Sequence, residues 1–428
     1  MPISLPITRI EGKRKLLIIA AFWPESNATA SGVRNWGIIE ACQKQDWQVV
    51  FASTAKENRF TQLLNEAGVL TQFIAPNDSA FDVWIANEAP DFVLLDQFLI
   101  EEQFSWRIRQ HSPQTVRILD TQDLHFLRRG RQEAVKQGVA LDRVFAADIE
   151  LEKDETALRE LASIYRSDHT LLVSDFEQAL LTERFDVPTA LLSLCRFFYP
   201  APTHVSAIES RNHFVIIGNF RHPPNADGIR WFRSCLWPKI RKAIPKAQVH
   251  VYGAYCSEEF SQAHSEASGF LVKGQAADAV ATLSQYLVNL APLRFGAGIK
   301  GKIADGWAAG TPAVTTLIGA EGMSDLGQWG GLIAHSESEF IDAAIHLYQD
   351  DEQWRVAQAN GFRLLKQLFD KDVESEKLIT VLLSLSKNTE SIRAKNSVGS
   401  LLWHQTLRST EYFSRWIELK QLVASTRA

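Results

Sequence analysis

The sequence predicts an α/β fold made of two Rossmann-like domains with parallel sheets. Short apolar runs of strand length alternate with helical patterns along most of the chain, which is typical of parallel sheets covered by helices on both faces. Several of these runs end in glycine loops that lead into a helix. The chain has 428 residues, 46% of them hydrophobic, which exceeds one typical core and suffices for two.

Apolar runs predict the sheet of a first domain, which we expect over residues 1–195. The expected strands lie at residues 15–21, 47–51, 70–74, 91–95, 115–119 and 169–174. After the first strand, a loop containing Gly32 leads into a helix. Gly32 would let the helix N-terminus approach a phosphate or sugar across a cleft, and the alternative is a tight turn between strand and helix.

The richest polar cluster of this half follows the strand at 115–119. Its sequence, DTQDLHFLRR over residues 120–129, combines carboxylates, an imidazole and guanidinium groups. Ligands bind at the carboxyl ends of parallel strands, so we expect Asp123 and His125 to be catalytic, with His125 positioning a hydroxyl group. The alternative is that Asp120 or Asp123 caps a helix whose arginines are solvated.

A stretch without helical or strand period, residues 196–212, is predicted to link this domain to a second one over 213–386. The expected strands of the second domain lie at residues 213–218, 247–253, 269–274, 286–292, 313–316 and 331–334. Arg221 follows the first of these strands. We expect it to face the cleft and pair with a diphosphate, the alternative being a surface arginine.

The strongest chemical pattern of the chain lies at residues 290–323. A strand is followed by Arg294 and then by Gly296 and Gly298, where the missing side chain lets the backbone approach a ligand closely. A helix begins directly after this loop. Its N-terminus offers unpaired N–H groups and the positive end of the helix dipole, which suit a phosphate.

The same helix has one apolar and one polar face. Gly298, Lys302 and Asp305 share a face by their i, i+4, i+7 spacing. Lys302 would reach a diphosphate while Asp305 accepts hydrogen bonds from a ribose diol, which suggests a nucleotide. The alternative is a surface ion pair between these two residues, worth only ~0.2–0.5 kcal/mol.

The run PLRFGAGIKGKIADGWAAGTPAV at 292–314, with IGAEGM at 318–323, resembles the donor-binding signature of retaining nucleotide-sugar glycosyltransferases of the GT-B fold, in the large family-four (group 1) class. The segment GNFRHPPNAD at 218–227 is similar to the opening of that family's donor domain, and residues 120–125 resemble its D-T-H-D-L-H segment, with Gln122 in place of the first histidine. The resemblance implies two facing domains with the active cleft between them.

The resemblance also implies the chemistry. A sugar would pass from a nucleotide-sugar donor to a glycan or glycoconjugate acceptor, with retention and without a metal or cofactor. Lys302 and Arg294 would stabilise the departing diphosphate, Asp305 would hold the ribose, and Glu321 would touch donor sugar hydroxyls, unless it is an exposed turn residue. The expected donor-binding residues are Gly32, Arg221, Arg294, Gly296, Gly298, Lys300, Lys302, Asp305 and Glu321; the expected catalytic residues are His125, Asp123 and Lys302.

Within the donor-binding run at 292–314, two positions depart from the family pattern. Asp305 stands where the family usually has a glutamate, and Ala297 stands where many members have a second glutamate beside the donor sugar. These departures motivate an alternative, a non-catalytic GT-B subunit that binds a partner enzyme. An epimerase or phosphorylase on the same fold is a further alternative.

The net charge and the cysteine content limit the classes of partner and the cell compartment that we expect. A net charge of -5 argues against a general nucleic-acid binder, and the scattered cysteines, four in all, suit a reducing cytoplasm. We expect no export signal, since the N-terminus lacks the apolar core of a signal peptide. We also expect no transmembrane helix, since no run of about twenty apolar residues occurs. Assembly of surface polysaccharide is implied by the resemblance only.

The tail at 387–428 combines aromatic and aliphatic residues with several Lys and Arg residues. As one or two amphipathic helices it has three alternative roles: covering the first domain, docking a protein partner, or touching an anionic membrane surface. The last would place the protein at the inner face of the membrane.

Overall fold

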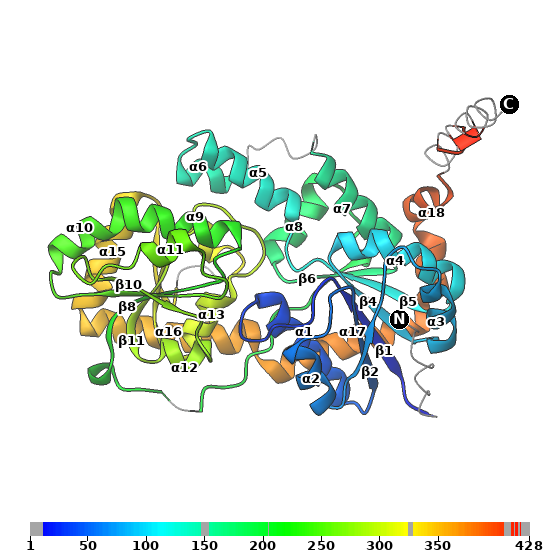
Figure 1. Cartoon of the computed structure of the whole chain (residues 1–428), viewed down its shortest axis with the longest axis horizontal. Coiled ribbons are helices and arrows are strands. Elements are labelled where there is room, and N and C mark those ends of the chain that lie inside the picture. Colours follow the sequence, from blue (N-terminus) through cyan, green and yellow to red (C-terminus); the bar gives the residue numbers. More distant parts are fainter. Residues whose placement is uncertain are drawn as a thin grey trace.

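Two parallel β-sheets, one in each half of the chain, organise the computed structural model, and the two domains lie side by side along its longest axis (Figure 1). The structure describes residues 12–146, 154–203, 205–323 and 328–405, together with 412–414, 416–417 and 420 near the C-terminus. The predicted α/β fold with two Rossmann-like domains is confirmed.

The first domain is built on strands that are mostly buried, as a sheet covered on both faces requires. Its strands are β1 (Lys15–Ala20), β2 (Gln48–Ser53), β3 (Leu70–Phe73), β4 (Phe92–Asp96), β5 (Val116–Asp120), β6 (His169–Leu172) and β7 (Leu192–Leu194). Its helices are α1 (Ala30–Gln43), α2 (Arg59–Glu66), α3 (Ala80–Glu88), α4 (Phe98–His111), α5 (His125–Lys136), α6 (Leu141–Ala146), α7 (Glu155–Arg166) and α8 (Asp175–Arg184). Among the described residues the strand order is β3-β2-β1-β4-β5-β6-β7.

The second domain repeats this plan after a link whose described residues include a 3-10 turn at Ile208–Ser210. Its strands are β8 (Asn212–Ile217), β9 (Val249–Tyr252), β10 (Phe270–Gly274), β11 (Tyr286–Ala291), β12 (Ala313–Thr316) and β13 (Gly331–Ala334). Its helices are α9 (Pro223–Trp231), α10 (Trp237–Ala243), α11 (Glu258–Gln262), α12 (Ala279–Leu283), α13 (Gly301–Ala308), α14 (Leu317–Ala320), α15 (Glu337–Gln349) and α16 (Asp351–Phe369). In the described part of this domain the strand order is β10-β9-β8-β11-β12-β13.

Each sheet reverses its strand order at one point. β1 pairs in parallel with both β2 and β4, and β8 pairs with both β9 and β11. At such a point the connections that follow the two neighbouring strands, β1 and β4 or β8 and β11, go to opposite faces of the sheet. This opens a crevice at the carboxyl ends of these strands. The fold therefore directs a ligand site to the loops after β1 and β4 in one domain and after β8 and β11 in the other.

Two C-terminal helices return the chain to the first domain. α17 (Lys371–Lys395) follows α16, and its Leu378, Ile379, Leu382 and Leu385 are buried in the core that holds β1 and β2. α18 (Ser397–His404) then packs against α7. The return thus begins at residue 371, inside the range that we predicted for the second domain. Residues 406–411, 415, 418–419 and 421–428 of the predicted tail lie outside the described residues.

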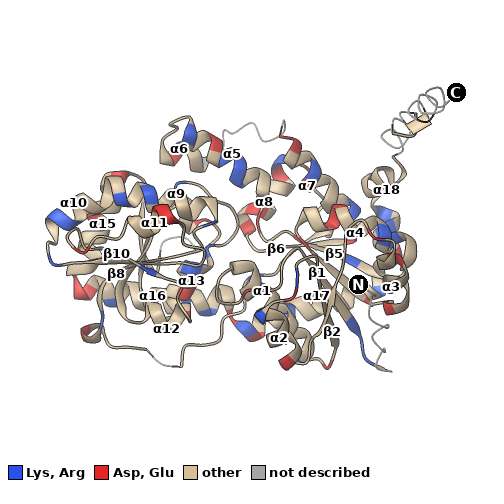
Figure 2. Cartoon of the chain, in the orientation of Figure 1, with Lys and Arg blue, Asp and Glu red and all other residues tan. Residues whose placement is uncertain are grey.

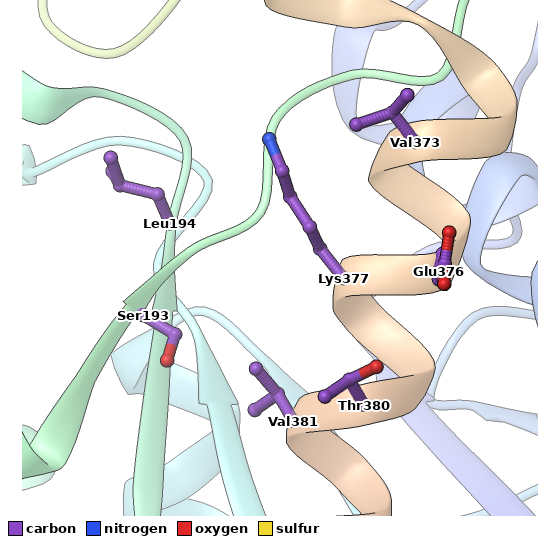
Figure 3. A pocket seen from close by; sticks show the side chains of 7 residues that line it. All are labelled: Ser193, Leu194, Val373, Glu376, Lys377, Thr380 and Val381. Carbon is purple, nitrogen blue, oxygen red and sulfur yellow. The ribbon is translucent and has the colours of Figure 1, made fainter.

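The strand β7 was not among the predicted ones, because three residues are too few to show an alternating pattern. It forms an edge of the first sheet, next to β6. A cavity of about 450 Å³ lies between β7 and α17, lined by side chains of these two elements that include Ser193, Leu194 and Lys377 (Figure 3). This cavity belongs to the first domain and its return helix.

Figure 2 shows that acidic and basic residues are mixed along the helices of both domains. No helix within the described ranges has both the length and the apolar content needed to cross a bilayer.

Candidate active site

Two loops at the carboxyl ends of β5 and β11 meet between the domains. Gly298, in the loop between β11 and α13, has a φ of +63°, and a Cβ added there would lie 2.9 Å from the Asp123 Cβ and 2.9 Å from the Gln122 carbonyl oxygen. Only glycine fits such an approach. The close neighbour of this glycine is therefore the β5–α5 loop of the first domain, which carries the predicted catalytic cluster.

Lys302 lies where the strand order of the second sheet reverses. A Cβ on Gly218, directly after β8, would lie 3.0 Å from the Lys302 Nζ. The ammonium group donates a hydrogen bond to the Asn225 Oδ1 at 2.5 Å. Burial lowers the pKa of Lys302 to about 8, although the nearby Asp305 carboxylate acts in the opposite direction. Lys302 is thus a cation placed at the crevice that the fold provides.

Asp305 lies one turn further along α13 and is held by a residue of the interdomain link. The Tyr199 hydroxyl donates a hydrogen bond to the Asp305 Oδ1 at 2.6 Å. Burial raises the pKa of Asp305 to about 6, against the opposing effects of Tyr199 and Lys302. Each of the two α13 residues thus has its hydrogen-bond partner outside this helix. Within the described residues, an ion pair between Lys302 and Asp305 does not form.

The two arginines predicted to bind the donor, Arg294 and Arg221, have different partners in the structure. Arg294 forms a bidentate ion pair with Asp227, with Nη2 and Nε at 2.5 and 2.9 Å from the carboxylate oxygens. The Arg221 guanidinium lies 4.2 Å from the centroid of the Tyr255 ring. Tyr255 in turn donates to both carboxylate oxygens of Glu25 in the first domain, at 2.7 and 2.8 Å. Arg221 is therefore part of a contact between the domains.

The glycine loop, residues 292–300 between β11 and α13, is held from the first domain by two buried ionisable side chains. Glu177 of α8 accepts the N–H groups of Leu124 at 2.9 Å and of Gly298 at 2.8 Å. Arg131 of α5 donates to the Gly296 carbonyl oxygen at 2.9 Å. These contacts fix the backbone of the loop, and they leave the Gly298 N–H occupied by a carboxylate.

Two predicted donor-binding residues, Lys300 and Glu321, are buried beside this loop. Arg131 engages both carboxylate oxygens of Glu321, at 2.9 and 2.5 Å. Lys300 donates to the Gly298 carbonyl oxygen at 2.7 Å. The structure thus places Glu321 in an ion pair between the domains and Lys300 on the loop backbone, whereas we expected both to face the donor.

Asp123 and His125 are adjacent, as expected, but they differ in what they face. Asp123 accepts from the Arg128 Nε at 2.7 Å, and the His125 Nε2 lies 3.4 Å from its other oxygen. Burial would raise the pKa of Asp123, but Arg128 and His125 reverse this effect and lower it. Burial lowers the pKa of His125, so its imidazole is neutral near pH 7. The ring packs edge to face on Phe98, with 5.3 Å between centroids.

Gln122, in contrast, stands at the tip of this loop. Its φ is +62°, which is uncommon for a residue with a side chain and frequent at functional sites. Its amide donates to the Asp120 Oδ2 at 3.0 Å. Its carbonyl oxygen is the one that approaches Gly298, so Gln122 lies directly against the glycine loop. The resembled family segment has a histidine at this position.

Gly32 has a packing role in the structure. A Cβ there would lie 2.4 Å from the Glu25 carbonyl oxygen, so the turn into α1 admits only glycine. Its N–H donates to the Thr29 hydroxyl at 3.0 Å, which caps α1. This geometry favours the tight-turn alternative over a phosphate site at Gly32.

Several residues of this region were not predicted from the sequence. Arg34 is buried and binds Asp120 through its Nε and Nη2 at 2.8 Å each. Asp96, at the end of β4, has a pKa raised to about 7, chiefly by burial. Glu177, Arg131 and Tyr199 were missed as well. Their partners are distant in the sequence, so no local pattern marks them.

Comparison with known proteins agrees with this architecture. Residues 211–350 match the family model described as glycosyl transferases group 1. No curated protein matches the sequence significantly.

Solved structures with the same fold cover most of the chain. Sucrose-phosphate synthase from Thermosynechococcus elongatus has a TM-score of 0.67 at 13% identity, over 87% of this chain and 99% of the other. HepE from Anabaena, in complex with UDP and glucose, has a TM-score of 0.64 at 11% identity, over 87% and 100%. An O-GlcNAc transferase mutant from Thermobaculum terrenum has a TM-score of 0.54 at 15% identity, over 90% and 71%. The chain therefore has the GT-B glycosyltransferase fold, and its second domain matches the group 1 glycosyltransferase model.

Proposed function

We propose that the chain is a glycosyltransferase that moves a sugar from a nucleotide-sugar donor to a hydroxyl group of a glycan, lipid-linked or other glycoconjugate acceptor, with retention of anomeric configuration. One observation carries this proposal. The glycine loop after β11 touches the Gln122–Asp123 loop of the first domain through Gly298 and leads into α13, whose Lys302 lies at the crevice of the second sheet and whose Asp305 is held by Tyr199.

The chemistry assigned to these groups is electrostatic. The bond from the sugar C1 to the diphosphate oxygen breaks, a bond from C1 to the acceptor oxygen forms, and the acceptor proton leaves with the nucleoside diphosphate. Lys302 and Arg294 stabilise the charge that develops on the departing diphosphate, which makes a metal ion unnecessary in this proposal. Asp305 binds the ribose diol through its carboxylate.

The acceptor hydroxyl is assigned to the β5–α5 loop. Neutral His125 and ionised Asp123 offer hydrogen-bond acceptors there, and Gln122 offers an amide. Closure of the two domains around donor and acceptor would exclude the water that hydrolyses the donor.

A uridine nucleotide is the first candidate for the donor. This choice is supported by HepE, whose structures hold UDP with glucose or UDP-glucose. The base would be read by the loops after β9 and β10, near residues 253–256 and 274–275.

A non-catalytic GT-B subunit is the second candidate, and Ala297 favours it. Ala297 is 9% exposed and packs with first-domain residues that include Leu119 and Leu124. The residue therefore offers a methyl group at the position where many members of the resembled family carry a carboxylate. An epimerase or phosphorylase would be recognised by its product, an epimerised nucleotide sugar or a sugar phosphate.

Thermal unfolding of the wild type and of Asp305→Ala with UDP, GDP, ADP and CMP tests the proposal. A nucleotide at about a hundredfold over its Kd adds ~2.7 kcal/mol to the stability of the domain that binds it. At roughly 2–4 °C per kcal/mol, the Tm should rise by several degrees in the wild type and much less in Asp305→Ala.

The outcome separates the two candidates. A shift with one nucleotide, followed by transfer of sugar from the corresponding nucleotide sugar, supports the transferase. A wild type that none of the four nucleotides stabilises contradicts it and favours the non-catalytic subunit.

A further inference from the structure

Tyr199 occupies the point where the chain crosses between the domains twice. Its backbone N–H donates to the Phe369 carbonyl oxygen at 2.8 Å, and its carbonyl oxygen accepts from the Lys371 N–H at 2.9 Å. The first crossing, after β7, is thereby paired with the second crossing, between α16 and α17. Tyr199 is therefore built into the hinge between the two domains.

The side chain of Tyr199 points from this hinge into the donor domain. Its ring is buried in the apolar cluster that includes Ile303 and Trp307 of α13. The hydroxyl lies 2.6 Å from the Asp305 Oδ1 and 3.2 Å from the Gly301 carbonyl oxygen. A buried aromatic ring has few rotamers, so its hydroxyl holds the Asp305 carboxylate in one orientation.

One carboxylate oxygen of Asp305 is engaged in this way. Among the described residues, no hydrogen bond reaches the other oxygen, Oδ2. An aspartate is one methylene shorter than a glutamate, so its reach toward a ligand depends more closely on its orientation. A fixed partner on Oδ1 leaves Oδ2 as the acceptor that a diol can use.

We propose that Tyr199 is a positioning residue for nucleotide binding: it turns the Asp305 carboxylate toward the ribose diol and couples that carboxylate to the hinge between the domains. This inference rests on the proposed function, since it needs a ribonucleotide in the donor site. Tyr199 itself does not touch the substrate in this proposal. A change of hinge geometry would move its hydroxyl relative to Asp305, and nucleotide affinity would therefore depend on the arrangement of the domains.

The test compares the wild type with Tyr199→Phe, which removes the hydroxyl and keeps the ring and the backbone pairing. Calorimetric titration with UDP and with 2′-deoxy-UDP measures both affinities, or the matching pair for whichever nucleotide stabilises the wild type. Tyr165→Phe is the matched control, because within the described residues the Tyr165 hydroxyl bonds only to the Asp186 carbonyl oxygen of the first domain.

We expect Tyr199→Phe to bind UDP about tenfold more weakly than the wild type, the size expected for a hydrogen bond to a charged group. Its affinity for 2′-deoxy-UDP should change much less, because the diol that Asp305 would hold is already incomplete. Tyr165→Phe should match the wild type with both ligands.

Other outcomes overturn the inference. If Tyr199→Phe loses affinity equally for UDP and for 2′-deoxy-UDP, Tyr199 has a purely structural role. If its affinity for UDP is unchanged, Tyr199 has no role in nucleotide binding. Tighter UDP binding would mean that Tyr199 competes with the ribose for Asp305. If the wild type binds no nucleotide at all, the proposed function fails and the inference fails with it; if the wild type binds and only the Tyr199→Phe comparison disagrees, the proposed function stands.

Discussion

At the scale of single residues, the candidate donor site depends on two groups whose pKa values are shifted toward neutrality. Burial lowers the pKa of Lys302 to about 8 and raises that of Asp305 to about 6. The ammonium form of Lys302 attracts a diphosphate, and the ionised form of Asp305 accepts hydrogen bonds from a diol. The protonated Lys302 and the ionised Asp305 are therefore both the main forms between about pH 6 and pH 8.

We therefore expect nucleotide-sugar affinity to pass through a maximum between about pH 6 and pH 8. Below the pKa of Asp305 the carboxylate is protonated and loses acceptor strength, and above the pKa of Lys302 the ammonium loses its charge. UDP-glucose is the suitable probe, because its diphosphate ester stays ionised over this range. Titrations between about pH 5 and pH 9 give the dependence of Kd on pH.

Lys302→Arg is the control for this prediction. A guanidinium stays protonated throughout, so the loss of affinity on the alkaline side should disappear while the loss on the acid side remains. An alkaline loss that persists unchanged in Lys302→Arg would contradict the assignment to Lys302.

At the scale of elements, the glycine loop and the turn after α14 are held by α5 and α8 of the opposite domain. The ion pair of Arg131 with Glu321 is fully buried, with side chains 0% and 1% exposed. The Arg159–Glu102 pair, between α7 and α4, is 41% and 27% exposed. Because a buried charge without its partner is costly and an exposed one is not, these two pairs should respond differently to the loss of the arginine.

We expect Arg131→Ala to lower the free energy of unfolding by ~3–5 kcal/mol, because it removes both hydrogen bonds of Arg131 to the buried Glu321 carboxylate and leaves only the Lys300 ammonium, at 4.0 Å, as its charged partner. Arg159→Ala, the matched control, should cost only ~0–1 kcal/mol. Urea unfolding followed by circular dichroism measures both. If the two variants lose similar stability, the Arg131–Glu321 pair does not hold the domains together as we describe.

At the scale of the whole molecule, the two domains are joined by two crossings and by α17, which inserts into the core of the first domain. The chain then continues past α18, where Tyr412, Phe413 and Trp416 are helical and 63%, 60% and 53% exposed. Residues 406–428 hold four Lys or Arg residues and two Glu residues, a positive balance in a chain of net charge -5. Exposed aromatic side chains next to positive charge suit an anionic membrane surface.

We therefore propose that the tail binds anionic membranes. The protein should co-sediment with vesicles of mixed phosphatidylcholine and phosphatidylglycerol more than with vesicles of phosphatidylcholine alone, and less so at high salt. The variant Phe413→Ala/Trp416→Ala should sediment less. Equal sedimentation of the wild type with both kinds of vesicle would contradict the proposal and favour a protein partner.

The sequence by itself determined the features that depend on neighbours along the chain. Buried apolar runs marked the strands of both sheets except β7, and the order of strands and helices was enough for the α/β class. Lys302 and Asp305 were predicted from their spacing to share one helix, and both lie on α13. The expectation that Gly298 lies on the same helical face is wrong, because α13 begins at Gly301 and Gly298 is in the preceding loop with a φ of +63°. These properties are local, because strand length, helical period and the conformational freedom of glycine involve only a few consecutive residues.

Only the tertiary structure decided which loops meet. Tyr199 binds Asp305 across 106 positions, Glu177 binds Gly298 across 121, and Arg131 binds Glu321 across 190. Each of these contacts depends on the placement of two whole sheets and on the crossings between them. A carboxylate such as Glu321 has the same local sequence whether it faces a donor sugar or an arginine of the other domain, because its partner is set by the packing of the domains.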